Sequence, residues 1–367
     1  MIQQNAEALL LEKKNNAIFS IMTEADNREV LDLVNSTAIK GNIEISFTKG
    51  PDYLKVLKIC ADDVQAVIGK VNNKVEILGT RSLKKAYING AKETLGYLSD
   101  LKISKNAKKI HALSDGFKFM KSLMDDNRAK LHIATIIEDN KQGKIALTWA
   151  NKNPNIPNFY DLGIMNTYFI LPLLPKFISK KVQIIRGTID ILDDIVEFLN
   201  TEGRKKQFFP IYTKEDFLNL PNFNVNDFYV AIKNNVIIGV IAKWEQTPFK
   251  QVIIKKYNNK WKWIKKFTGK ILPQENEQIK QFYLGFMAIK DNDNSIFEAL
   301  LGKIHNDNRH YKYFSLILHS QDNLNRSLNK FLSIKYKSRL YITEFIKNEE
   351  IIKMIDDRIP YLELAGL

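Results

Sequence analysis

Residues 96–103 of the chain read GYLSDLKI, and residues 283–289 read YLGFMAI. The two stretches belong to a longer series of similar segments. VLDLVN at 30–35 matches IVEFLN at 195–200, and DVQAVIGKVNN from Asp63 matches DFYVAIKNN from Asp227 at nearly the same separation. Similar segments that keep their order and spacing are typical of an internal repeat. The sequence therefore predicts two diverged copies of one α/β unit.

The separation between the copies grows toward their ends. HIATIIEDN ending at Asn140 corresponds to FSLILHSQDN ending at Asn323, which are farther apart than the earlier pairs. This growth indicates an insertion in the second copy, for which residues 249–273 are the expected place. We expect one domain over residues 1–178 and a second over 179–367, and the 367 residues are enough for two domains of ordinary size.

The hydrophobic pattern of each copy predicts a mixed sheet with helices, an α/β (α+β) fold. Asp26 or Asn27 is the expected N-cap of the first helix, and Pro51 is expected to begin a second, short one. Asn72-Asn73 and Asn89-Gly90 are expected to be tight turns between strands. The remaining expected elements of the first copy are strands at 17–23, 64–70, 74–87, 94–103 and 131–137, a helix at 109–124 and a helix that begins at Asn140.

Composition limits the cellular setting and the partners. Lysine and arginine outnumber aspartate and glutamate by 55 to 41, a formal net charge of +14. This charge suits nucleic acid, an anionic membrane surface or a polyphosphate ligand, and it equally suits lysine-rich solvation of a large surface. The single cysteine cannot form an intrachain disulfide, so a reducing compartment is allowed. The N-terminus lacks a basic segment before its apolar run, and prolines interrupt the most apolar stretch, so we expect a cytoplasmic protein without a membrane span.

Several short motifs, in their order and spacing, resemble the GNAT acyltransferase superfamily, and more narrowly a bacterial subgroup with two GNAT-like domains in one chain. They are EISF from Glu44, GYLSDLKI, DGF from Asp115 and EDN from Glu138 in the first copy, and FKQ from Phe249, LP from Leu272, YLGFMAI and YKSRLYI from Tyr336 in the second. The resemblance covers residues 16–345. It implies two tandem GNAT-like folds and transfer of an acetyl or other acyl group from acyl-coenzyme A (acyl-CoA) to an amine.

The resemblance also implies where the coenzyme binds. Its pantetheine arm would lie between strands 97–103 and 131–137 like an added strand, with the pyrophosphate at the N-terminus of the next helix. The implied coenzyme contacts are Leu101, Lys102, Ile103, Lys108, Lys109, Ile110, His111, Ala112 and Asn140. Ile110 stands where the family's phosphate loop has glycine, and the nearby lysines can compensate by charge. In the second copy DNDNSIFEA from Asp291 places carboxylates there, so we expect no coenzyme site in that copy.

Acyl transfer needs a deprotonated amine and a proton for the leaving thiolate. Asp100, beside the expected thioester, is the candidate general base, and the alternative is a structural ion pair with a lysine. Thr148 and Trp149 occupy the stretch where the family commonly has a general-acid tyrosine. Tyr160 is therefore the candidate acid, with Tyr168 as a second choice. The alternative to an enzyme is a GNAT-fold binding or regulatory protein that has lost catalysis.

The remaining residues give weaker signals. Cys60 lies in an apolar run and is interpreted as a packed thiol rather than a nucleophile. His111 and His132 have no neighbours at metal-ligand spacing, so no metal is expected. The segment Lys255–Lys270 mixes lysine with tryptophan, a pattern that fits an amphipathic helix on its own domain better than a nucleic-acid or lipid site. We expect the amine acceptor to enter near Glu44–Asp52 and the face between the two copies.

Overall fold

The computed structural model describes residues 17–36, 43–105, 107, 110–138, 140–150, 152–178, 182–259, 262–263, 265 and 274–367. Its strands are β1 (Ile18–Ile21), β2 (Ile43–Lys49), β3 (Asp63–Val71), β4 (Lys74–Ile88), β5 (Ala91–Ile103), β6 (Leu131–Ile137), β7 (Asn158–Ile170), β8 (Gln183–Arg186), β9 (Phe228–Lys233), β10 (Val236–Trp244), β11 (Lys250–Tyr257), β12 (Gln281–Ile289), β13 (Tyr313–His319) and β14 (Ser333–Glu344). Its α-helices are α2 (Asn27–Ser36), α3 (Tyr53–Lys58), α4 (Ile110–Met124), α5 (Lys141–Ala150), α6 (Leu192–Gly203), α7 (Lys214–Leu218), α9 (Asn294–Asp307) and α10 (Asn325–Leu328).

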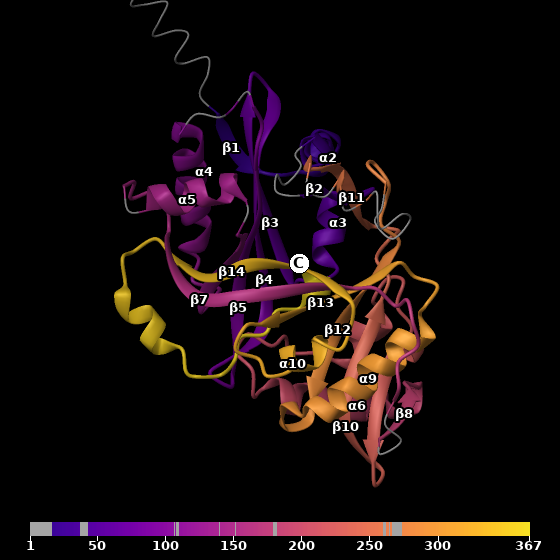
Figure 1. Ribbon diagram of the computed structural model, residues 1–367. Coiled ribbons are helices and arrows are strands. Elements are labelled where there is room, and N and C mark those ends of the chain that lie inside the picture. The colour runs from indigo at the N-terminus through magenta and orange to yellow at the C-terminus, as the bar shows by residue number, and fades with distance from the viewer. Residues whose placement is uncertain are drawn as a thin grey trace, which may run out of the picture.

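One large mixed sheet runs through both copies (Figure 1). Its strand order is β1-β3-β4-β5-β6-β14-β7-β13-β12-β10-β9-β8. The pairs β5–β6 and β12–β13 are parallel, and every other neighbouring pair in this order is antiparallel. The expected mixed α/β fold is therefore confirmed. None of the helices in the described residues is long and apolar enough to cross a bilayer.

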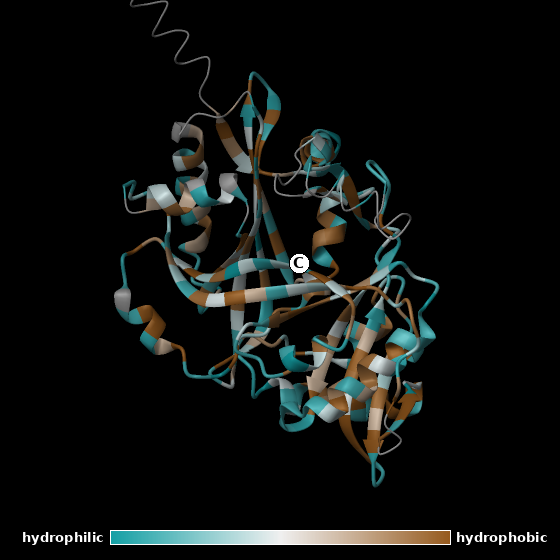
Figure 2. Ribbon diagram, viewed as in Figure 1, coloured by the Kyte–Doolittle hydropathy of each residue, from teal (hydrophilic) through white to brown (hydrophobic). Residues whose placement is uncertain are grey.

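The last strands of the two copies are interleaved at the centre of this sheet. Strand β14 of the second copy lies between β6 and β7 of the first, and β7 pairs on its other edge with β13 of the second copy. Leu340 and Ile342 of β14 are fully buried there. The main apolar core consequently contains residues of both copies, and Figure 2 shows the apolar residues following the strands while hairpin tips are polar. The domain boundary at residue 178 stays a prediction. In the sheet the strands from the two sides of this boundary are interleaved, so the two copies are not separate in space.

The expected turns are confirmed, and the expected helix starts need correction. Asn72 and Asn73, with φ of 49° and 60°, and Asn89-Gly90, with φ of 53° and 74°, take the left-handed conformation that two-residue hairpins require. The first helix is entered through a 3-10 turn at Glu24–Asp26, and Thr23 precedes it. Asp26 accepts hydrogen bonds at 2.8 Å from the backbone and the hydroxyl of Thr23, so it lies inside the first turn and is not the N-cap. Helix α3 begins at Tyr53 with Asp52 as its N-cap, so Pro51 lies before the helix and does not begin it.

Strand β2 was not expected from the sequence. It pairs antiparallel with β11, so that Phe47 lies opposite Val252 and Lys49 lies opposite Lys250. The two-stranded sheet packs over the central strands through a small apolar cluster. The insertion expected at 249–273 therefore begins with a strand, and the helix expected from Lys255 is wrong for Lys255–Tyr257, which belong to β11. Much of the insertion beyond Tyr257 lies outside the described residues. The pairing partner is about 200 residues away, so a local pattern cannot reveal it.

Strands β5 and β6 pair over a short stretch and then part. Their parallel register runs from Leu95 opposite Leu131 to Leu98 opposite Ala134, although both strands continue. At the paired end, the fully buried Arg81 of β4 donates a hydrogen bond to His132 Nε2 at 3.0 Å. It also forms a bidentate salt bridge with the Asp126 carboxylate, with both hydrogen bonds at 2.8 Å. Burial, and secondarily the Arg81 charge, lowers the pKa of His132 to about 4, so the ring is neutral and accepts this bond. No side chain fits at position 96 beside His132, because a Cβ added to Gly96 would lie 2.1 Å from the ring.

The contacts of Arg81 predict that it holds the paired end of the opening together. Arg81→Met leaves the Asp126 carboxylate and several acceptors without their buried donor, and we expect a loss of about 3 kcal/mol in the free energy of unfolding. Arg128→Met is the matched control, because Arg128 contacts the same Asp126 at 2.7 Å but is 43% exposed. Its loss should stay below about 1 kcal/mol. Urea unfolding measures both, and equal losses would contradict this account.

Candidate functional site

The two copies share a backbone irregularity at the same place. Asp100 in β5 and Phe286 in β12 both have φ of 51°, a conformation that residues with side chains rarely adopt. Next to each of these residues, the register with the antiparallel neighbour in the sheet shifts. The shift lies between Leu78 and Thr80 of β4 in the first copy and between Val240 and Ala242 of β10 in the second. A bulge of this kind redirects the strand and its backbone groups. Each copy therefore carries a bulge in the strand, β5 or β12, that parts from its parallel neighbour, β6 or β13.

A cavity of about 630 Å³ opens where β5 and β6 part. One end lies under helices α4 and α5, against residues such as Leu113, Phe117 and Ala146. The other end reaches one face of the central strands β7, β12, β13 and β14 and is covered by β2 and β11 through Phe47 and Val252. The cavity thus passes from the helices of the first copy, through the gap in the sheet, to strands of the second.

The structure brings five of the predicted site residues together. Asp100, Leu101, Lys102, Ile103 and Asn140 all line the larger cavity. Asn140 also fits its alternative reading as a helix cap, because its side chain accepts a hydrogen bond from the backbone of Gly143 at 3.2 Å.

The other predicted residues are not assembled in this way. Lys108 and Lys109 lie outside the described residues, and Ile110, His111 and Ala112 form the first turn of α4. Tyr160, the candidate acid, lines neither cavity, and its hydroxyl accepts a hydrogen bond from the Asn348 backbone at 2.7 Å, so its role as an acid stays a prediction. The second choice, Tyr168, also lines neither cavity and donates to Asn325 at 2.8 Å. Spacing along β7 could not show which side of the strand faces the opening.

Asp100 is held in a network of buried groups. Lys49 of β2 and the hydroxyl of Tyr53 in α3 both donate to its Oδ2 atom, at 2.6 and 2.7 Å. Burial alone would raise the pKa of Asp100, but Lys49, Lys102 and these hydrogen bonds outweigh it and lower the pKa to about 2. A carboxylate with so low a pKa is a weak proton acceptor near neutral pH. The geometry therefore favours the structural ion pair over the general base, and the role as a base stays a prediction.

The ion pair predicts a stability loss that a second substitution recovers. Asp100→Asn leaves Lys49, only 9% exposed, without its counter-charge, and we expect a loss of about 3 kcal/mol in the free energy of unfolding at pH 7. The double variant Asp100→Asn with Lys49→Met should recover most of this loss. Because the folded-state pKa lies below the ordinary value of 3.8, the stabilisation is present above about pH 4 and disappears as the pH falls toward 2. Additive losses in the double variant, measured by urea unfolding, would contradict the pairing.

Tyr97 is a site residue that the sequence reasoning missed. Its ring lies in the wall between two cavities, and its hydroxyl is 2.6 Å from the hydroxyl of Thr135 across the gap. Burial raises the pKa of Tyr97, so the phenol stays protonated at neutral pH. Its place in GYLSDLKI, one of the segments similar between the two copies, was a signal that could have found it.

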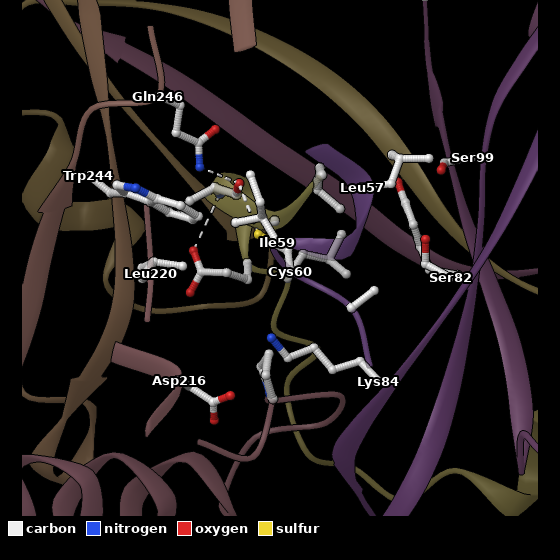
Figure 3. Close-up of a pocket in the computed structure, with 18 of the residues that line it drawn as sticks. Leu57, Ile59, Cys60, Ser82, Lys84, Ser99, Asp216, Leu220, Trp244 and Gln246 are labelled. Carbon is white, nitrogen blue, oxygen red and sulfur yellow. Dashed lines mark hydrogen bonds between the residues drawn. The ribbon is translucent and has the colours of Figure 1, made fainter. Parts of the chain in front are cut away.

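A second, smaller cavity of about 150 Å³ adjoins the first. Figure 3 shows its wall, with Cys60, Lys84, Trp244 and Gln246 around the space. The two cavities share five lining residues, Lys49, Tyr97, Ser99, Lys250 and Leu367. Burial raises the pKa of the Cys60 thiol, and Cys60 packs against the main core, as expected of a packed thiol.

Lys250 marks the junction of the two cavities. Its ammonium group donates to the backbone oxygen of Leu367 and lies 4.9 Å from the centre of the Tyr283 ring. Burial, and secondarily the adjacent Lys49, lowers the pKa of Lys250 to about 8. The sequence could not single out Lys250, because its position follows from the pairing of β2 with β11.

The bulge of the second copy is occupied by the chain itself. The Phe286 backbone N–H donates to the Glu363 carboxylate at 2.7 Å, and the next N–H, of Met287, donates to the Tyr361 hydroxyl at 3.3 Å. Tyr361 in turn donates to Glu363 at 2.8 Å. Gly285 permits this approach, since an added Cβ would lie 2.5 Å from the Glu363 carboxylate. In the first copy, the matching residues Asp100 and Leu101 line the open cavity instead.

The buried Glu363 predicts a pH effect on stability. Burial raises the pKa of Glu363 above 4.5, although its hydrogen bonds oppose the shift. A carboxyl group with a raised folded-state pKa contributes its full stability below the unfolded pKa and loses it as the pH rises through the folded one. Glu363→Gln keeps an acceptor oxygen but cannot ionise. We expect its free energy of unfolding, relative to that of the unmodified chain, to increase between pH 5 and 8. A pH-independent difference in urea unfolding would contradict this assignment.

Among the described residues, no group of three or more histidine, cysteine, aspartate or glutamate side chains is arranged to hold a metal ion. No histidine is present among the described residues that line the two cavities, whose polar groups include lysine, hydroxyl, amide and carboxylate groups.

Comparison with known proteins identifies the fold. No family model and no curated protein matches the sequence. Among solved structures, a GCN5-related N-acetyltransferase from Sphaerobacter thermophilus matches with a TM-score of 0.57 and 10% identity, over 95% of this chain and 98% of that one. The N-myristoyltransferase of Saccharomyces cerevisiae with bound myristoyl-CoA matches with a TM-score of 0.57 and 12% identity, over 89% and 82%.

A third match is the GCN5-related glucosamine N-acetyltransferase region of a fungal multi-domain β-N-acetylglucosaminidase. Its TM-score is 0.62 and its identity 11%, over 89% of this chain and 38% of that longer protein. These similarities extend over nearly the whole chain. The chain has the tandem GNAT fold, as the sequence motifs indicated.

Proposed function

We propose that this chain is an acyl-CoA-dependent N-acyltransferase whose coenzyme binds in the first copy. The observation that carries the proposal is the cavity at the gap between β5 and β6, next to the bulge at Asp100. Strands that part leave backbone groups without partners across the gap, and an extended arm with amide groups can pair with them as an added strand. Pantetheine is such an arm.

The direction of the coenzyme follows from the position of helix α4. This helix begins at Ile110, shortly after β5 ends at Ile103, so its free N–H groups lie near the mouth of the gap. A pyrophosphate would bind there, with the exposed Lys105 in the segment that leads into the helix. The thioester would then point inward, toward the bulge. Leu101, Lys102, Ile103 and Asn140 are the wall residues we assign to the coenzyme.

The second copy is proposed not to bind coenzyme. Glu363 and Tyr361 accept the N–H groups of its bulge, where a ligand would otherwise bind. The carboxylates of Asp291 and Asp293 lie at the start of α9, and Asp293 caps that helix through Ser295. Negative charge at this place favours the helix and opposes a phosphate group.

The groups around the thioester position suggest how transfer would proceed. The neutral amine attacks the thioester carbonyl, the C–N bond forms and the C–S bond breaks. The nitrogen gives up one proton, and coenzyme A leaves as a thiolate that takes one up. The protonated Tyr97 phenol lies in the wall at this point and can donate a hydrogen bond to the thiolate. Asp100 would hold Lys49, and with it strand β2 over the cavity, in place.

Binding of acetyl-CoA tests the proposal directly. Ala146 lines the cavity from helix α5, whereas Ala150, one turn further on, does not. We expect calorimetry to detect acetyl-CoA binding to the full chain, Ala146→Trp to weaken it at least tenfold by filling the cavity, and Ala150→Trp to leave it unchanged. Failure of the unmodified chain to bind acetyl-CoA at millimolar concentration would exclude the enzyme.

A non-catalytic binding or regulatory protein is the second candidate. The observation that favours it is Ile110 at the start of α4, where the superfamily resembled by the sequence has a glycine next to the phosphates. Binding of acetyl-CoA without transfer to any amine would favour this candidate over the enzyme.

A further inference from the structure

The end of the cavity opposite the coenzyme has a distinct lining. It is formed by side chains that point from one face of the central strands, with Tyr283 of β12 opposite Ser315 of β13 and Tyr336 of β14 opposite Thr167 of β7. We call this face, formed by Thr167, Gln281, Tyr283, Ser315, Tyr336 and Ser338, the cavity floor. Because the coenzyme enters from the α4 side, the cavity floor lies on the far side of the thioester and is left for the acceptor.

The cavity floor is polar but uncharged. Hydroxyl and amide groups alternate on it with the rings of Tyr283 and Tyr336. Gln281 Oε1 and Ser315 Oγ are buried and have no hydrogen-bond partner among the described residues. A buried polar atom without a partner costs stability, and a ligand with hydroxyl groups offers the missing bonds. A purely apolar amine would leave both atoms unpaired.

Charge around the cavity argues against a polycationic acceptor. Asp100 is the sole acidic side chain among the described residues that line it, and Lys49 and Tyr53 donate hydrogen bonds to its carboxylate. Two further lysines, Lys102 and Lys250, line the same space. Among the described side chains of the lining, Asp100 therefore offers no free carboxylate to pair with a second or third ammonium group of a polyamine.

Space and burial argue against a peptide or protein acceptor. The cavity floor is enclosed, with Ser315 fully buried and Gln281 only 4% exposed, and β2, β11 and the segment Leu364–Leu367 close over it. The volume of about 630 Å³ must hold the inner part of the pantetheine arm as well. What remains suits a small molecule. Phe47, Phe169 and the two tyrosines supply flat apolar faces.

We propose that the acceptor bound on the cavity floor is a small amino sugar, a single amine on an uncharged polyhydroxyl ring. Its hydroxyls would bond to Ser315, Gln281 and Ser338, and its C–H faces would lie on the aromatic rings. The inference rests on the proposed function, since it takes the coenzyme to bind between β5 and β6.

The test compares acceptors with the full chain and acetyl-CoA, by the release of the coenzyme A thiol. D-Glucosamine probes the amino sugar, spermidine a polyamine, glycine an amino acid and hexylamine an apolar amine. We expect D-glucosamine to have the highest kcat/KM. Ser315→Ala should raise the KM for D-glucosamine about tenfold, the effect of one lost hydrogen bond, with the Kd of acetyl-CoA unchanged.

Ser46→Ala is the matched control. Ser46 in β2 is also fully buried, its hydroxyl also has no partner among the described residues, and it lines neither cavity. It should leave KM unchanged. Better use of spermidine, glycine or hexylamine, no transfer to any of the four amines despite acetyl-CoA binding, or equal effects of the two serine variants would overturn the acceptor inference alone. Absence of acetyl-CoA binding would instead overturn the proposed function on which it rests.

Discussion

The parting of β5 from β6 is the constraint on which the rest of the site depends. A sheet can open in its middle only if its closed end is held and its open edges are supported, because unpaired buried backbone groups are costly. Arg81, bonded to His132 and Asp126, holds the closed end. On the open side, β6 keeps its other edge paired with β14, from Ile137 opposite Ser338 to His132 opposite Thr343. The cavity is therefore a consequence of strand pairing, and its walls come from both copies.

The duplication explains why the two copies can differ. Both copies retain the bulge, with φ of 51° at Asp100 and at Phe286, so their backbone geometry is alike at this position. In the second copy Glu363 and Tyr361 satisfy the bulge, whereas in the first the side chain of Asp100 turns to Lys49 and Tyr53 and the cavity stays open. The closed copy supplies the cavity floor and the interleaved strand β14. The proposed coenzyme site thus lies in one copy, and the other completes the chamber around it.

Sequence patterns predicted the local parts of this fold and missed the parts that depend on distant partners. The turns at Asn72-Asn73 and Asn89-Gly90 and the strand Leu131–Ile137 follow from nearby residues. Strand β2 could not be predicted, because its partner β11 lies in the other copy. For the same reason the candidate site contained Asp100 and Asn140 but lacked Lys250, whereas Tyr97 was missed although it lies within GYLSDLKI. Alternation along β7 does not show which face meets the opening, so it could not place Tyr160 relative to the cavities.

The pairing of Lys49 with Lys250 links stability to function. Two like charges opposite each other on neighbouring strands repel, and burial makes the repulsion stronger. Asp100 relieves it for Lys49, while Lys250 responds with a pKa lowered to about 8. A chain selected for stability alone would place apolar side chains at such positions. Two buried lysines suit a chamber that holds charged or strongly polar groups, and the proposed acyl transfer would bring a thioester, a leaving thiolate and an amine into it.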